Sequence, residues 1–246
     1  MNFISYQYAF FLGAVFLLYW RLGRKAQHWL LLIASYGFYA CWDWRFLGLI
    51  FLTSCIDFVS GRQIHSALKT HSSSHKAKLW LAFTLVTNLS ILAYFKYANF
   101  FIESFINLLS SLGIETHTGT LSIILPVGIS FYIFQTLTYL IDIYKKKIVP
   151  EKSFINYATF VAFFPQLVAG PIERASNLLP QFNKVTSINS KIFYLGLKII
   201  IFGLFLKVFI ADNLASTVDD IFSDYKNYSG GILSLGVVYF SIKIYS

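Results

Sequence analysis

The chain has 246 residues, of which 57% are hydrophobic, 19% aromatic and only 13% charged. A soluble domain of average composition carries about 25% charged residues, because its surface must remain in contact with water. The composition excludes a disordered chain, a secreted disulfide scaffold and almost any soluble enzyme, and it indicates a membrane protein. The net charge of +9 is typical of cytoplasmic loops with excess Lys and Arg, so we expect no nucleic-acid partner.

The apolar residues form continuous blocks, which predict helices. A spanning segment must satisfy its own backbone hydrogen bonds, either as a helix or within a closed barrel. Barrel strands alternate apolar and polar residues, and these blocks do not. We therefore predict an all-α fold, a polytopic transmembrane helical bundle that forms a single membrane domain over residues 1–246. The blocks cover residues 3–20, 29–42, 46–60, 79–95, 121–144, 154–170, 192–211 and 232–245.

Basic residues occupy alternate loops between these blocks. Residues 21–28, 61–78 and 145–152 are rich in Lys and Arg, whereas the turn at 43–45 is neutral and residues 110–120 contain neither. Basic loops tend to lie on the cytoplasmic side of a membrane. The pattern predicts a multi-pass protein of the cytoplasmic membrane with its N-terminus outside and the three basic loops inside.

The alternation breaks at residues 154–170, because the loop after them, residues 171–191, is again basic. A segment that enters and leaves the membrane on one side resolves this conflict. Proline removes a helical hydrogen bond and glycine loosens the backbone, which favours a broken, re-entrant segment. The breaking residues of this segment are Pro165, Gly170 and Pro171.

Residues 97–112 have a different pattern, with a polar stripe of Asn99, Glu103, Asn107 and Ser110 on an otherwise apolar helix. We expect an amphipathic helix at the outer interface. The alternative is that these residues extend the preceding span. The whole chain then has about seven spans, one re-entrant segment and one interfacial helix.

Four polar residues lie within or beside apolar blocks and are candidates for function. A charge at membrane depth is unfavourable by about 3 kcal/mol, so it is expected to have a role or to reach an interface. Three of them are charged and could pair with a nearby basic residue or reach an interface. Asp57 has Arg62 nearby, and Asp142 has Lys145 and Lys146 nearby. Lys207 is close to a predicted outer end. Gln135 has neither nearby, and it could line a cavity or bond another helix.

The sequence predicts no metal site. His71 and His75 have the spacing of helical metal ligands, but three serines separate them and no Cys or carboxylate joins them. A basic, hydrated loop is the favoured interpretation.

Several motifs together carry a family resemblance. They occupy residues 94–101, 125–135, 139–144, 163–172 and 207–215. In this order and spacing they resemble the membrane-bound O-acyltransferases (MBOAT), in the branch that includes the alginate O-acetyltransferase subunit. The resemblance covers essentially the whole chain.

The resemblance implies acyl transfer, commonly of acetyl, to hydroxyls of an extracytoplasmic polysaccharide or cell-envelope polymer. The donor would be an acyl-CoA or a derived carrier, used as a co-substrate, with no bound cofactor. The partners would be membrane lipid, the donor, the acceptor polymer and envelope proteins. A tunnel would bring donor and acceptor together, and the residues implied for its wall are Pro165, Gln166, Gly170, Pro171 and Gln135. Glu173 and Arg174 would lie at its cytoplasmic mouth.

Members of this family are about twice as long, and their catalytic His belongs to a Trp-His-Ile-Ser-like motif. That motif is expected beyond Ser246, and none of the five His residues here matches it. We therefore assign no catalytic residue and expect a truncated N-terminal half that is inactive alone. The alternative is a non-catalytic membrane scaffold or transport element.

Overall fold

A computed structural model describes residues 4–70, 74–113, 123–167, 170–184 and 189–246. All regular structure in these ranges is helical, which confirms the predicted all-α class. The chain divides into two compact units, residues 1–184 and residues 185–246, and each is described by itself. That the two make a single membrane domain remains a prediction.

The first unit begins with α1 (Tyr6–Arg21), which Ser5 caps by accepting a hydrogen bond from the backbone N–H of Tyr8 at 3.2 Å. Such a cap satisfies one of the N–H groups that a helix start leaves free. The remaining elements follow in order, with a 3-10 turn, η1, joining the second and third helices. They are α2 (Arg24–Asp43), η1 (Trp44–Phe46), α3 (Leu47–Lys69), α4 (Ser74–Ser111), α5 (Ile129–Tyr144), α6 (Phe154–Ala162) and α7 (Ala175–Asn183).

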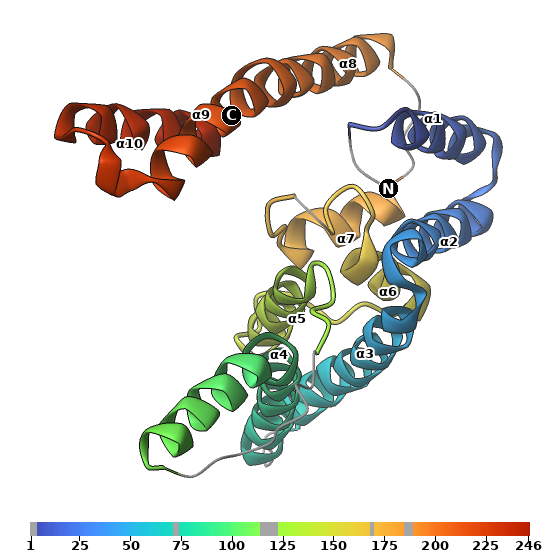
Figure 1. The fold of residues 1–246 in the computed structure, drawn as a ribbon. Coiled ribbons are helices and arrows are strands. Elements are labelled where there is room, and N and C mark those ends of the chain that lie inside the picture. The colour runs from blue at the N-terminus through green and yellow to red at the C-terminus, as the bar shows by residue number, and fades with distance from the viewer. Residues whose placement is uncertain (1–3, 71–73, 114–122, 168–169, 185–188) are drawn as a thin grey trace. The chain divides into compact units, whose positions relative to one another are not determined.

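The core of this unit lies where α5 and α6 meet the longer helices. α3 packs along α4, α5 contacts both, and α6 contacts α2 and α3 (Figure 1). At the centre, the ring of Tyr139 lies 4.9 Å from that of Tyr157, and Phe160 packs on both at 6.2 Å. All three side chains are fully buried. The two short helices are therefore the most enclosed part of the unit.

The second unit is a long helix followed by a helical hairpin. It contains α8 (Ser190–Phe205), a π-helical stretch η2 (Leu206–Ala211), α9 (Asp212–Ser223), a 3-10 turn η3 (Tyr225–Asn227) and α10 (Gly230–Tyr245). α9 and α10 pack closely, since a Cβ added at Gly236 would lie 2.9 Å from a methyl group of Ile221. An ion pair at 2.9 Å between Lys243 and Asp219 also joins the two helices.

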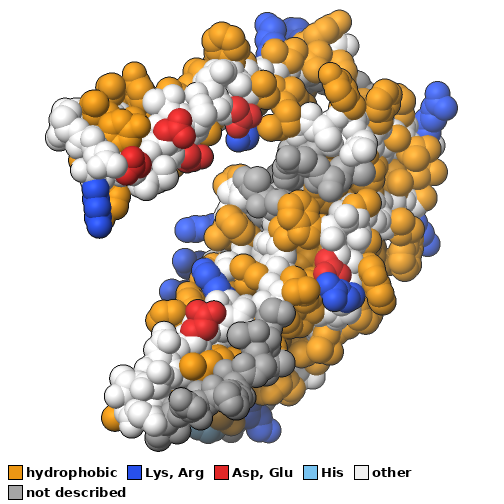
Figure 2. All heavy atoms as spheres, in the orientation of Figure 1, with side chains coloured by type: hydrophobic (Ala, Val, Ile, Leu, Met, Phe, Trp, Pro, Cys, Tyr) orange, Lys and Arg blue, Asp and Glu red, His pale blue; other side chains and the backbone are white. Residues whose placement is uncertain are grey.

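Three helical stretches in the described residues are long and apolar enough to cross a membrane: Arg24–Lys69, Ser74–Ser111 and Ser190–Ser223. A shorter apolar helix, Gly230–Tyr245, follows. Hydrophobic side chains cover much of the visible surface (Figure 2). These features agree with a membrane protein, while the count of about seven spans remains a prediction.

The interfacial helix expected at residues 97–112 is not a separate element. These residues continue α4, which runs without interruption for 38 residues from Ser74 to Ser111. Residues 97–111 therefore extend the helix of the preceding block, while their position at a membrane interface remains a prediction. No proline or glycine occurs within α4, so nothing in the backbone stops the helix where the sequence turns amphipathic. A pair of hydrogen bonds between the Asn99 side chain and the backbone of Ile123, at 3.2 and 3.3 Å, ties this extension to the segment before α5.

Candidate functional site

The predicted broken segment is a short helix followed by a tight turn. α6 ends at Ala162 after 9 residues, about 14 Å of helix, which is less than half the thickness of a bilayer core. The carbonyl of Phe163 then accepts from the backbone N–H groups of Gln166 and Leu167, both at 3.0 Å. Pro165 is exposed at the top of this turn. Residues 168 and 169 lie outside the described residues.

Two of the predicted wall residues meet in the structure. Gln135, on α5, is 3% exposed, and its Nε2 donates to the carbonyl of Phe160 at 2.9 Å. Nε2 of Gln166 donates to Oε1 of Gln135 at 3.1 Å. Gln135 therefore bonds α6 on one side and the turn after it on the other, which fixes the broken segment against α5.

The turn also packs against the start of α5 at a glycine. Gly128 has a φ of +71°, and a Cβ built there would lie 2.5 Å from the carbonyl oxygen of Leu167. The backbone N–H of Phe164 donates to Oγ of Ser35 on α2 at 3.3 Å. Neither contact was anticipated from the sequence. The glycine within the motif at residues 125–135 was the available signal for the first one.

The other predicted residues continue along the chain from this turn. The N–H of Gly170 donates to the carbonyl of Gln166 at 2.9 Å. Pro171 is exposed, and Glu173 is half-buried. Arg174 is exposed and directly precedes α7. The hydrogen bond therefore joins Gly170 to the turn. That these four residues form part of a tunnel wall or its mouth remains a prediction.

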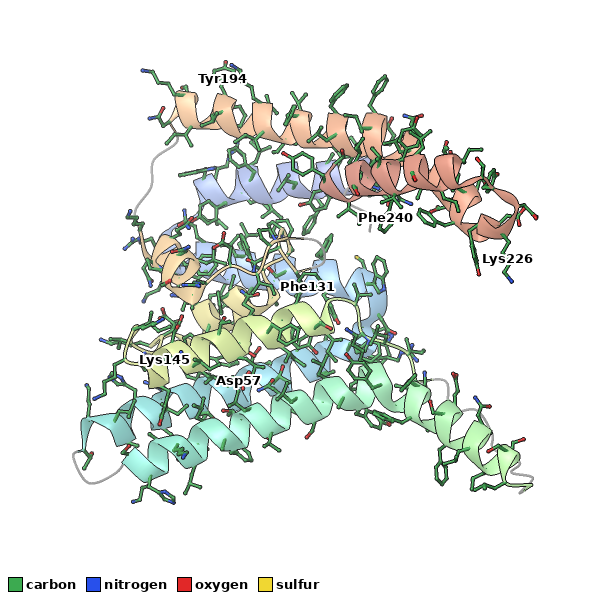
Figure 3. The ribbon with its side chains drawn as sticks, turned by 90° about the vertical axis from the view of Figure 1, so that its left-hand side faces the viewer. Asp57, Phe131, Lys145, Tyr194, Lys226 and Phe240 are labelled. Atoms are coloured by element: carbon green, nitrogen blue, oxygen red, sulfur yellow. The ribbon has the colours of Figure 1, made fainter. Side chains whose placement is uncertain are left out.

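A cavity of about 1040 Å³ lies beside the start of α6. One wall is formed by residues 147–153, which follow the end of α5. Lys145 marks this end of α5 in Figure 3. The other wall is α7, and His28 of α2 completes the rim. Three of the four loops predicted to be cytoplasmic, residues 21–28, 145–152 and 171–191, thus contribute to one cavity, and the described part of residues 61–78 does not line it.

The lining of this cavity bears on the prediction that residues 154–170 form a re-entrant segment. Ser153 and Asn156, at the start of α6, line the same cavity as Ala175 and Asn183 of α7. The chain therefore leaves this side of the unit at residue 154 and has returned to it by residue 175. That is the path of a re-entrant segment, although its placement in a membrane remains a prediction.

Asp57 is fully buried on α3, between α4 and α5 (Figure 3). Nδ2 of Asn88 on α4 donates to its Oδ1 at 2.8 Å. Oδ2 of Asp57 and Oδ1 of Asn88 have no hydrogen-bond partner among the described residues. The expected pairing of Asp57 with Arg62 does not occur. The guanidinium of Arg62 instead lies 5.2 Å from the ring centre of Phe58. Asn88 was missed, although it is an amide inside the apolar block of residues 79–95, the same signal that singled out Gln135.

The two remaining charges are paired near the surface. Asp142 has Lys147 as its partner, at 3.9 Å, rather than the expected Lys145 or Lys146. Lys207 donates to Asp212 at 2.6 Å, and both side chains are about half exposed. Exposed pairs of this kind contribute about 0–1 kcal/mol, so they carry no strong sign of function.

No group of three potential metal ligands occurs in the part of the chain that the structure describes. His71, half of the considered His pair, lies outside that part, as does His117. His28 has a structural contact, since its Nε2 donates to the carbonyl of Phe182 at 2.9 Å.

Replacing Gln135 by Ala should loosen the broken segment. The change removes both hydrogen bonds and leaves the carbonyl of Phe160 without this donor, so we expect a loss of about 1–3 kcal/mol of stability. The midpoint of thermal unfolding in nanodiscs measures this. Gln181→Ala is the control, because Gln181 is exposed and bonds only within its own helix, to the carbonyl of Asn177. Equal midpoints for the two variants would contradict the prediction.

Comparisons with known proteins show which proteins the chain is similar to. The model of the membrane-bound O-acyltransferase family, MBOAT, matches residues 145–245. A probable alginate O-acetylase, AlgI, of Azotobacter vinelandii is 37% identical over the whole chain, which covers 48% of that relative. The corresponding protein of Pseudomonas aeruginosa is 38% identical over the whole chain, covering 46% of its length. A peptidoglycan O-acetyltransferase of Helicobacter pylori is 36% identical over 77% of this chain and 39% of its own length.

No solved structure matches the chain. The family match covers α6, the turn after it, α7 and the second unit, and the whole-chain matches add the helices that hold the turn in place. The chain spans about half the length of the curated relatives it matches. By sequence the chain is similar to the membrane-bound O-acyltransferases over residues 145–245, and to the probable alginate O-acetylases over its whole length.

Proposed function

We propose that the chain forms part of a membrane O-acyltransferase that transfers acetyl groups to hydroxyls of a polysaccharide or peptidoglycan outside the cytoplasmic membrane. The observation that carries this proposal is identity of 37–38% along the whole chain to proteins described as alginate O-acetylases. The peptidoglycan O-acetyltransferase adds a second acceptor of the same chemical class, a carbohydrate hydroxyl.

The donor in this proposal is an acyl-CoA or a derived carrier that arrives from the cytoplasm, with no resident cofactor. The protein would be a multi-pass protein of the cytoplasmic membrane that works with envelope partner proteins. The broken segment would form part of the wall of a substrate tunnel, with Glu173 and Arg174 at its cytoplasmic mouth. Non-helical backbone at membrane depth is tolerated where it is covered by protein or lines a wet cavity, which supports this assignment.

The chemical step requires a base that takes the proton of the acceptor hydroxyl as its oxygen attacks the donor carbonyl. A histidine suits this task near neutral pH. None of the five His residues here occupies the motif that the family uses. We therefore assign the chain the role of positioning substrates, and we propose that these 246 residues alone carry out no transfer.

A chimera tests the proposal. In it the chain replaces the matching segment of the alginate O-acetylase of Pseudomonas aeruginosa, and the O-acetyl content of alginate is measured in cells that lack the native protein. We expect acetylation to return with the chimera and to be absent with the 246-residue chain alone. A chimera with Gly37→Ala, at a helix surface with open space around it, should acetylate as well as the parent.

Two results would overturn the proposal. One is a chimera that inserts and folds but leaves alginate unacetylated, which would favour a scaffold or transport role. The other is transfer by the 246-residue chain alone that disappears when one of its own His residues is replaced, because this would place the base inside the chain. Insertion is checked separately by detergent extraction and size-exclusion chromatography.

A further inference from the structure

The cavity between α6 and α7 has a positively charged wall. Its lining includes Lys147, Lys152 and Lys184 against one carboxylate, Glu151, which leaves a net charge of 3 − 1 = +2. Oε1 of Glu151 already accepts from the backbone N–H groups of Lys152 and Ser153, both at 2.9 Å. The carboxylate is thus occupied by the start of α6, and it is less available to the lysines.

Two of these lysines are unpaired. Lys147 lies 3.9 Å from Asp142, whereas Lys152 and Lys184 form no ion pair with any described residue. Both are exposed, and they stand on opposite walls of the cavity, one before α6 and one after α7. Lysine ammonium groups around a concave site attract anions, and phosphate groups in particular.

The buried side of the cavity has a hydrogen-bond acceptor without a donor. Asn156 lines the cavity and is only 3% exposed. Its Nδ2 donates to Oδ1 of Asn183 at 3.1 Å, but its own Oδ1 has no partner among the described residues. A buried acceptor without a donor is unfavourable by about 1–3 kcal/mol. Because protein encloses this oxygen, a ligand that brings a hydroxyl or amide N–H satisfies it only when the Asn156 amide turns toward the cavity.

The wall formed by α7 is held in place from α2. The guanidinium of Arg24 donates to the carbonyl of Asn183, and Nε2 of His28 donates to the carbonyl of Phe182. These carbonyls belong to the last turn of α7, where a helix leaves its acceptors free and basic side chains are favourable. Asn183 and Lys184 are therefore presented by a fixed helix end rather than by a loose loop.

We infer that this cavity binds an anionic phosphate ester with a hydrogen-bond donor close to its phosphate. Lys152 and Lys184 hold the phosphate, and Oδ1 of Asn156 accepts from the donor group once its amide turns toward the cavity. The volume of about 1040 Å³ suits such a ligand, since small-molecule sites span about 300–1,000 Å³. Two sources offer this chemistry at the cytoplasmic side: the headgroup of an anionic phospholipid such as phosphatidylglycerol, and a free phosphate ester such as coenzyme A.

Two binding measurements distinguish these sources. In the first, the 246-residue chain in phosphatidylcholine nanodiscs is titrated with phosphatidylglycerol, and bound lipid is counted by native mass spectrometry. In the second, the same nanodiscs are titrated with coenzyme A and its dissociation constant is measured by calorimetry. Neither measures acyl transfer, so failure here leaves the proposed function untouched. Only the coenzyme A result would rest on that function, by locating its donor.

The double variant Lys152→Gln and Lys184→Gln should weaken whichever ligand binds by about tenfold or more, because each lysine near a phosphate contributes on the order of 1 kcal/mol of attraction. The matched control is Lys69→Gln, an exposed lysine at the end of α3 outside the lining, which should bind as the parent does. Since all three lysines are exposed, the thermal midpoints should agree. A parent that binds neither ligand, or a double variant that binds as tightly as the parent, would overturn the inference.

Discussion

Gly128→Ala should destabilise the first unit by at least about 2 kcal/mol, the largest loss we expect from adding a single methyl group. The φ of +71° places Gly128 in the left-handed region, which an alanine enters at a cost of about 1–2 kcal/mol. The added Cβ would also lie 2.5 Å from a backbone oxygen, that of Leu167, which cannot rotate away as a side chain does. Either the start of α5 or the turn after α6 must then move.

The expected movement gives the prediction a local readout. Hydrogen exchange at the N–H groups of Gln166 and Leu167, both bonded to the carbonyl of Phe163, should become faster in Gly128→Ala. Gly37→Ala is the control, and we expect it to raise rather than lower the stability. Gly37 lies inside α2 with open space around its Cα. In a helix interior, alanine is favoured over glycine by about 0.5–1 kcal/mol. Unchanged exchange and an unchanged midpoint in Gly128→Ala would contradict the packing described for this turn.

Replacing Asn88 by Asp should be the most damaging change in the contact between α3 and α4. Asn88 now donates to the buried carboxyl of Asp57 at 2.8 Å. A second carboxyl in its place removes the donor and sets two acidic groups against each other away from water. We expect a loss of more than about 3 kcal/mol, because two carboxyls buried in contact cannot both ionise and have no cation to pair with.

The same pair should tolerate a change that keeps its hydrogen bond. Asp57→Asn retains an oxygen that can accept from Asn88, so we expect a much smaller loss. Asn88→Ala should cost about 1–3 kcal/mol, because it leaves the carboxyl without that donor. In a double-mutant cycle with Asp57→Ala and Asn88→Ala, the coupling should be about 0.5–3 kcal/mol.

Asp219→Asn is the control for removing a carboxylate. Its side chain is 72% exposed and pairs with Lys243 on the surface. The midpoint of thermal unfolding of this variant should therefore hardly change. If Asn88→Asp were as mild as this control, the buried contact between Asp57 and Asn88 would not hold α3 to α4. Near-zero coupling in the cycle would lead to the same conclusion.

Much of the helical layout follows from composition, because apolar blocks in lipid have few alternatives to helices. The helix α6 and its broken continuation were predictable from Pro165 and Gly170, since these residues disrupt a helix whatever surrounds it. The end of α4 was not predictable from its amphipathic pattern. A change of pattern marks where a helix changes surroundings, and only a backbone-breaking residue or tertiary contact ends it.

The candidate site divides in the same way. Gln135 stood out as a polar group in an apolar block and Gln166 through the family resemblance, but 31 positions separate them along the chain. Their hydrogen bond, and the approach of Gly128 to Leu167, depend on how α5 and α6 pack. The same holds for Asp57. Its neighbour in sequence, Arg62, suggested that the carboxyl reaches the surface, whereas the structure buries it against Asn88.

The sequence by itself determined that this is a helical membrane protein, which residues break its helices, and which family its motifs resemble. These properties are local, because they depend on hydrophobicity, backbone freedom and short spacing. The tertiary structure alone decided which polar groups become partners and that three basic loops line one cavity. Hydrogen bonds and cavities join residues far apart in the chain, and their positions depend on the packing of whole helices.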